Sequence, residues 1–164
     1  MSELKITSEV LAPESSISFT ISGNHPSRFL SMMPDLLKGV FKIDSSAVYE
    51  DELRWSAYEN EKYYFWGRWR GKVAKDARTT AWVEVKMQGE QNVKDNFGTV
   101  TVKIKGVMTS TWKFSSAIDK ALGLLYLKNI YADQRRRYNE EVKRDMERLA
   151  DILRGRMEII EKRN

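Results

Sequence analysis

The sequence predicts an α+β domain, in which a curved antiparallel sheet with two short helices near its N-terminus packs around a long C-terminal helix. Three observations predict this class. Residues 46–108 hold several short runs in which apolar and polar side chains alternate, which is the period of strands with one wet face. Residues 115–162 follow the period of a helix and contain no proline. The links between the alternating runs are short, which favours antiparallel neighbours.

The size and composition of the chain limit the classes of protein to consider. Its 164 residues fit one domain, which we assign to residues 1–164. There is no cysteine, which excludes disulfides and thiolate metal ligands. The first residues lack the pattern of a signal peptide and no run of about 20 apolar residues occurs, so we expect a cytoplasmic protein without a transmembrane segment. The net charge of +5 favours anionic partners, such as nucleic acid or lipid headgroups.

The N-terminal part is predicted to hold one strand and two short helices. Residues 1–15 form a lead-in without a strong pattern, and residues 17–21 alternate as a half-buried strand. Ser27 can cap a first short helix, which Pro34 interrupts. Residues 35–40 then form the second short helical piece.

Four further strands are predicted between the short helices and the long helix. In each of them most apolar side chains fall on one face, which marks the side of the sheet that packs on the core. The turns and the loop between them are rich in polar residues. The predicted strands are residues 46–58, 63–75, 79–88 and 98–108, separated by turns near 59–61 and 75–77 and by a loop at 89–96.

The long helix has two parts of different character. Residues 117–131 are apolar almost all round, and a helix of this kind is buried on most sides, so we expect it to cover the dry face of the sheet. Residues 138–160 carry one narrow apolar stripe between charged faces. We therefore predict that residues 133–164 form a helical extension, which could pair with a second copy to give a homodimer. The arginines at 135–137 mark either the point where the helix enters solvent or a contact to an anionic headgroup.

The order of these elements resembles the START-like, helix-grip (SRPBCC) superfamily, which includes polyketide cyclases and lipid-transfer proteins. The resemblance covers about residues 16–150 and lies in three segments, residues 18–40, 97–102 and 121–125. The chain departs from the superfamily in having five or six predicted strands instead of seven, and in a helix that runs further. The resemblance implies a hydrophobic or lipid-like small molecule bound between the sheet and the C-terminal helix, and some members are enzymes.

Residues that could carry catalysis are scarce. The one histidine, His25, precedes Pro26 in a predicted turn, and no nucleophile motif or glycine-rich phosphate loop occurs. The sequence therefore names no catalytic residue, no metal site and no cofactor, and leaves open whether the protein is an enzyme. Asp51 is the one carboxylate that alternation places among inward neighbours; it is either buried or displaced by a bulge in its strand.

The densest signal is the aromatic strand at residues 63–72. Its inward face alternates bulky rings with Gly67 and Gly71, which suits either a filled core or a cavity. We expect an apolar cavity between this strand and the long helix, and we predict that the protein binds a hydrophobic or amphipathic, lipid-like molecule there. The predicted cavity residues are Phe29, Met33, Trp55, Phe65, Trp69, Met87, Ile104, Leu122 and Leu125.

The outward face of the same strand suggests alternative functions. Aromatic rings interleaved with arginines can stack on bases and neutralise phosphates, so RNA or single-stranded nucleic acid is an alternative partner. Coverage by the long helix, by a second copy, or simple stacking of arginine on tryptophan would explain the same pattern. A further alternative is a co-chaperone-type adaptor that acts through the helical extension. The alternative surface residues are Tyr64, Trp66, Arg68, Arg70 and Trp82.

Overall fold

The chain folds into one antiparallel sheet and a set of helices on one of its faces, which confirms the predicted α+β class. The computed structural model describes residues 2–56 and 61–162, with side chains as far as residue 156. The predicted turn at 59–61 and the end of the predicted extension therefore lie partly outside the described residues. In chain order the elements are β1 (Ser2–Glu9), β2 (Ile17–Asn24), α1 (Arg28–Phe41), η1 (Ser45–Ala47), β3 (Val48–Trp55), β4 (Lys62–Ala74), β5 (Thr79–Asn92), β6 (Phe97–Phe114), α2 (Ala117–Tyr126), η2 (Leu127–Tyr131) and α3 (Ala132–Lys162).

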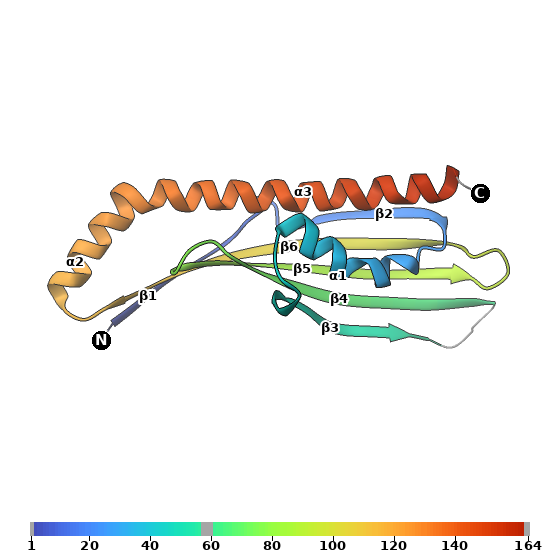
Figure 1. Cartoon of the computed structure of the whole chain (residues 1–164), viewed down its shortest axis with the longest axis horizontal. Helices are drawn as coiled ribbons and strands as arrows, with labels where there is room; N and C mark the ends of the chain where they lie inside the picture. The colour runs from blue at the N-terminus through green and yellow to red at the C-terminus, as the bar shows by residue number, and fades with distance from the viewer. Residues whose placement is uncertain (1, 57–60, 163–164) are drawn as a thin grey trace.

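The six strands follow the order β1-β6-β5-β4-β3, and β2 also pairs with β6. The first half of β6 pairs with β2, and its second half pairs with β1. The long strand β6 thus joins two regions of the molecule (Figure 1). We call the region that contains β2 to β5 and the first half of β6 the body. The far end consists of β1 and the second half of β6. β1 is missing from the sequence-based expectation, because its alternation is short and its inner side chains are only half-buried.

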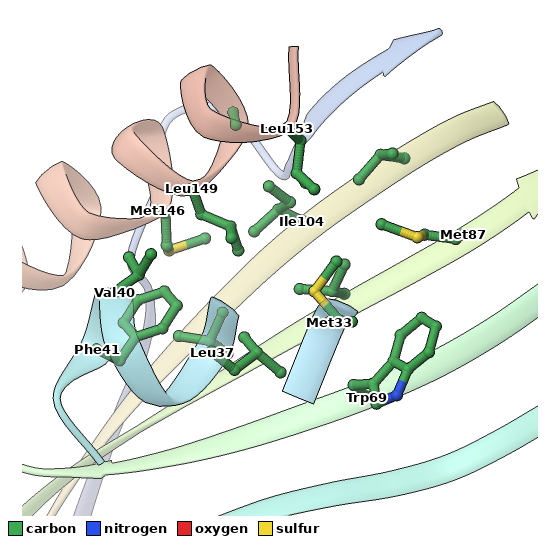
Figure 2. Close-up of a cluster of buried hydrophobic side chains, with 14 of the residues drawn as sticks. Met33, Leu37, Val40, Phe41, Trp69, Met87, Ile104, Met146, Leu149 and Leu153 are labelled. Atoms are coloured by element: carbon green, nitrogen blue, oxygen red, sulfur yellow. The ribbon is translucent and has the colours of Figure 1, made fainter. Parts of the chain in front are cut away.

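The main core lies between the sheet and the helices α1 and α3, which lie on the same face (Figure 1). Side chains from β4, β5 and β6 meet side chains from both helices there, as Figure 2 shows. The largest fully buried side chains include Met33, Leu37, Trp69, Met87, Ile104, Met146, Leu149 and Leu153.

The two halves of the C-terminal helix exchange their expected roles. Val142, Met146, Leu149 and Leu153 on α3 are fully buried against the sheet, whereas residues 117–130 on α2 and η2 lie at the surface. The expectation that residues 117–131 cover the sheet was wrong, and so was the placement of the stripe after residue 138 outside the core. The reason is the length of β6, whose 18 residues span about 60 Å, so that the helix starts at the far end and returns over the core later.

The N-terminal helix is also continuous where two pieces were expected. α1 runs through Pro34 and buries six apolar side chains on the sheet and α3. A proline inside a helix costs about 3 kcal/mol. Burial of one large apolar side chain is worth roughly 1.5–3 kcal/mol, so six of them outweigh the proline.

Candidate functional site

The predicted cavity residues divide into two groups. Phe29, Met33, Phe65, Trp69, Met87 and Ile104 are buried in the core, at 1% exposure or less. Trp55, Leu122 and Leu125, which were expected to face the same space, lie at the surface instead. In the core, side chains of α1, α3 and the strands contact one another directly (Figure 2). Binding of a small apolar molecule between sheet and helix stays a prediction.

Trp55 is exposed because of its place in the sheet. β3 is an edge strand, and α1 covers β4 more than β3. The pairing of Trp55 with Phe65 keeps it on the inner face, where it stacks against Tyr63 and Phe65 at ring distances of 5.5 and 5.8 Å. As a result, 53% of the residue remains accessible.

Asp51 sits in a bulge of β3, which is one of the two readings that the sequence left open. The register shifts between Glu50 and Glu52, so the residue between them leaves the alternation. Its carboxylate accepts hydrogen bonds from Arg70 Nε and Nη2 at 2.6 and 3.1 Å. The hydrogen bond from Arg70 lowers the pKa of Asp51, with a smaller effect from Arg68. Asp51 is therefore a surface ion-pair partner.

The alternative surface residues do share the outer face of the sheet, which is the face away from α1 and α3. Tyr64, Trp66, Arg68 and Arg70 alternate with the buried residues of β4, and Trp82 does so on β5. Their rings also take part in stacking within the chain. Arg54 lies 5.3 Å from the ring of Trp66, and Arg70 lies 5.1 Å from that of Trp82. Stacking of arginine on tryptophan, one of the explanations offered for this pattern, is therefore present at both Trp66 and Trp82.

At the far end of β6, one side of α2 is fixed against the sheet. Gly123 lies directly over Phe114, where an added Cβ would approach a ring carbon to 2.3 Å. The rings of Tyr126 and Tyr131 contact Trp112 at 5.8 and 5.0 Å. Ser116 caps the helix by accepting a hydrogen bond from the backbone N–H of Asp119 at 3.1 Å. These contacts set which side of α2 faces the protein.

Buried polar groups anchor the start of α3. The hydroxyl of Tyr131 donates to Asp76 at 2.7 Å and is also bonded to Thr79. Burial raises the pKa of Tyr131 to about 12, so the hydroxyl stays protonated at neutral pH. Arg135 donates to Ser110 Oγ and Ser8 Oγ, and to the carbonyl oxygens of Ile6 and Met108.

Arg135 consequently differs from the two arginines that follow it. Its bonds hold the helix to β1 and β6, and desolvation lowers its pKa. Arg136 and Arg137 are exposed. The arginine triplet therefore does not mark the point where the helix leaves the sheet, because its first member ties the helix down.

The other side of α2 is an uncovered apolar stripe. The side chains on α2 recur at helical spacing, and at 100° per residue Ile118, Leu122 and Leu125 fall within an arc of about 60°. Their exposure is high for such residues, at 74% for Ile118, 63% for Leu122, 58% for Leu125 and 60% for Ile130. A contiguous exposed patch of this kind marks an interaction site in a folded protein. We define the α2 stripe as Ile118, Leu122 and Leu125 on α2, together with Ile130 in η2, which follows α2 directly.

Positive charge gathers around the α2 stripe. Residues 113–137 hold six basic and two acidic side chains, a net charge of +4 in a chain whose total is +5. The two acidic side chains are already engaged: Asp119 accepts hydrogen bonds from Ser115, and Asp133 pairs with Arg136 at 3.4 Å. Within the described residues, Lys113, Lys120, Lys128 and Arg137 form no ion pair.

A surface pocket of about 630 Å³ opens beside the stripe, between the β4–β5 turn and the start of α3. Arg78 and Arg137 line it together with Asp76, Asp133 and Ile130. Arg78 lies over the ring of Trp112 at 4.0 Å. The sequence signal for this region was the apolar run at 117–131, which was assigned to the core.

Comparisons with known proteins give distant likenesses only. No family model matches the chain, and no curated protein matches it. The activated Cyt2Ba monomer from Bacillus thuringiensis subsp. israelensis is 9% identical over 67% of this chain and 74% of that chain, with a TM-score of 0.34. A Staphylococcus aureus protein of unknown function is 12% identical over 88% and 94%, with a TM-score of 0.27. Ara h 8.0201 is 11% identical over 83% and 99%, with a TM-score of 0.18.

Proposed function

We propose that this protein binds the surface of anionic lipid membranes through α2. The observation that carries the proposal is the α2 stripe, an exposed apolar face on a helix that Gly123 and Tyr126 fix against Phe114 and Trp112 through other positions. Among the helices that the structure describes, none combines the length and apolar composition needed to cross a membrane. A helix of this kind lies in the plane of the bilayer interface.

The position of α2 suits this attachment. The helix lies at one end of the elongated molecule, away from α1 and from β3, so a flat surface can reach it (Figure 1). An interfacial helix sinks its apolar face about 5–10 Å below the headgroups. Lys120 and Lys128 are exposed outside the stripe, and their long side chains let the ammonium groups reach the level of the phosphates.

The basic residues near the stripe favour an anionic bilayer over an uncharged apolar partner. Partial burial of the stripe is worth on the order of 5 kcal/mol. Each basic residue near an anionic surface adds about 1 kcal/mol. Because nearly all the net charge of the chain lies between residues 113 and 137, the attraction to anionic lipid is directed at the same end as the stripe.

We also propose that the chain is a divergent member of the START-like superfamily. The order of strand, helix, antiparallel strands and C-terminal helix across the sheet supports this relation. Members of that superfamily bind hydrophobic molecules between sheet and helix. Because side chains of α1 and α3 pack on that face of the sheet and α2 carries the exposed apolar residues, we assign the contact with a membrane to α2.

Co-sedimentation with vesicles tests the proposed function. The wild-type protein is expected to bind vesicles of phosphatidylglycerol and phosphatidylcholine, and to bind pure phosphatidylcholine vesicles more weakly. Leu122→Gln with Leu125→Gln keeps helix propensity and removes apolar surface. This double variant should lose about 2–3 kcal/mol of binding, roughly 30- to 150-fold.

The matched control is Val93→Gln, because Val93 is also an exposed apolar side chain but lies in the β5–β6 turn at the other end. It should bind vesicles like the wild type. Analytical ultracentrifugation of the wild type and the double variant tests the competing explanation, in which the stripe is a dimer contact. The membrane proposal is wrong if the wild type does not bind vesicles and is a dimer, whereas the double variant is a monomer. The stripe would then be a contact between two copies of the chain.

A further inference from the structure

We infer that the outer face of the sheet carries a second binding site, for single-stranded nucleic acid. This site is independent of α2 and rests on different residues. A surface groove of about 560 Å³ crosses the outer face, and we call it the outer groove. The residues of the outer groove used below are Ser18, Glu52, Trp66, Arg68, Lys86, Gln88, Thr101 and Lys103.

A row of three cations crosses the outer groove. The strand register pairs Arg68 on β4 with Lys86 on β5, and Lys86 with Lys103 on β6. Like charges placed directly opposite each other on neighbouring strands are destabilising. An anion bound across the row would relieve this repulsion.

The adjacent row of the same face has the ordinary arrangement. There Arg70 pairs with Glu84, and Glu84 pairs with Lys105, so the charges alternate in sign across the sheet. In this row the acidic side chain thus lies between two basic ones. The three consecutive cations are a local departure from this balance, confined to the outer groove.

The carboxylates nearest Arg68 are shared with other partners. Glu52 is held by Arg54 at 2.5 Å and by the indole N–H of Trp66 at 3.4 Å. Asp51 lies 3.8 Å from Arg68 but already accepts two hydrogen bonds from Arg70. The Nε of Arg68 is buried and has no hydrogen-bond partner.

Two of the three cations have a carboxylate within 4 Å, Arg68 through Asp51 and Lys86 through Glu84. Lys86 lies 3.5 Å from Glu84, and Lys103 forms no ion pair within the described part of the chain. The groove therefore offers the exposed ammonium group of Lys103 to an anion, in the same row as Lys86 and Arg68.

The other walls of the outer groove favour a nucleic-acid strand over a single phosphate. The groove crosses five strands, from Glu52 on β3 to Ser18 on β2, which at about 4.8 Å per neighbour is roughly 19 Å. That length exceeds one phosphate and suits a chain of them. Trp66 lines it with an aromatic ring, and rings of this kind stack on unpaired bases. Gln88 and Thr101 supply side-chain donors and acceptors for base edges or sugar hydroxyls.

Fluorescence anisotropy with a fluorescein-labelled 12-nucleotide oligouridylate tests the inference. The wild type should bind at low salt. Lys86→Gln with Lys103→Gln should weaken binding at least tenfold and reduce the slope of log affinity against log salt by about 1.4, since each phosphate contact on a single strand contributes about 0.7. Trp66→Leu should weaken binding roughly 5- to 150-fold through loss of stacking.

The matched control is Lys5→Gln with Lys94→Gln, which removes the same charge from exposed sites outside the groove. Circular dichroism of every variant checks that the fold is kept. The inference is overturned if the wild type fails to bind, or if both double variants weaken binding equally. It is also overturned if Trp66→Leu has no effect and polyphosphate competes as well as the oligonucleotide, because the site would then bind phosphate alone.

Discussion

At the scale of single residues, Gly123 and Gly155 occupy helices but meet opposite surroundings. An added Cβ at Gly123 would lie 2.3 Å from a ring carbon of Phe114, which is itself buried. An added Cβ at Gly155 would meet nothing within 4 Å. The first glycine is therefore needed for the close approach of α2 to β6, whereas the second only lowers helix propensity.

Alanine at the two positions should give opposite results in denaturant unfolding. Gly155→Ala is expected to raise the free energy of unfolding by about 0.5–1 kcal/mol, because alanine restricts the unfolded chain and favours the helix. Gly123→Ala should lower it by roughly 1–3 kcal/mol through the clash with Phe114. An equal gain in stability for both variants would contradict the placement of α2.

At the scale of elements, Arg135 joins three of them. Its four hydrogen bonds connect α3 to β1 through Ile6 and Ser8 and to β6 through Met108 and Ser110. Since β1 pairs with one strand only and its inner side chains are half-buried, these bonds are a large part of what holds it.

Replacing Arg135 should loosen β1. Arg135→Met leaves buried oxygen atoms without a donor and is expected to cost about 2–4 kcal/mol of stability, since bonds to charged groups contribute about 1.5–3 kcal/mol each and partly compensate. Hydrogen exchange should accelerate in residues 2–9. Arg137→Met is the control, because that side chain is exposed, and it should change stability by less than about 0.5 kcal/mol. Unchanged exchange in β1 would show that Arg135 is not its anchor.

The sequence predicted the strands of the body well, because side chains such as Val83, Val85, Val100 and Val102 alternate with polar neighbours and the period alone fixes their face. It did not predict which half of the helix covers them. An apolar helix at 117–131 is typical of a core element. Its composition does not show whether the apolar side chains are buried in the protein's own core or exposed for contact with a partner. The missing signal was the alternation of Ser110, Trp112 and Phe114, which extends β6 past residue 108 and moves the start of the helix to the far end.

At the scale of the whole molecule, the two proposed surfaces are compatible. The α2 stripe lies at the end that β1 and the tip of β6 carry, while the outer groove crosses β3, β4, β5, β6 and β2 in the body. A bilayer that receives α2 end-on leaves the outer face of the sheet free (Figure 1). The two partners would then bind the same molecule without competing for residues.

An end-on attachment can be measured directly, because the chain contains no cysteine and accepts single labels. A polarity-sensitive fluorophore on Ala121→Cys in α2 should shift to the blue on anionic vesicles and be quenched by brominated lipids. The same label on Lys94→Cys, in the β5–β6 turn at the opposite end, should not change. Equal quenching at both sites would mean that the long axis lies flat on the bilayer, and no quenching at Ala121 would contradict insertion of α2. End-on binding requires quenching at the first site alone, because the two labels then differ in depth by most of the length of the molecule.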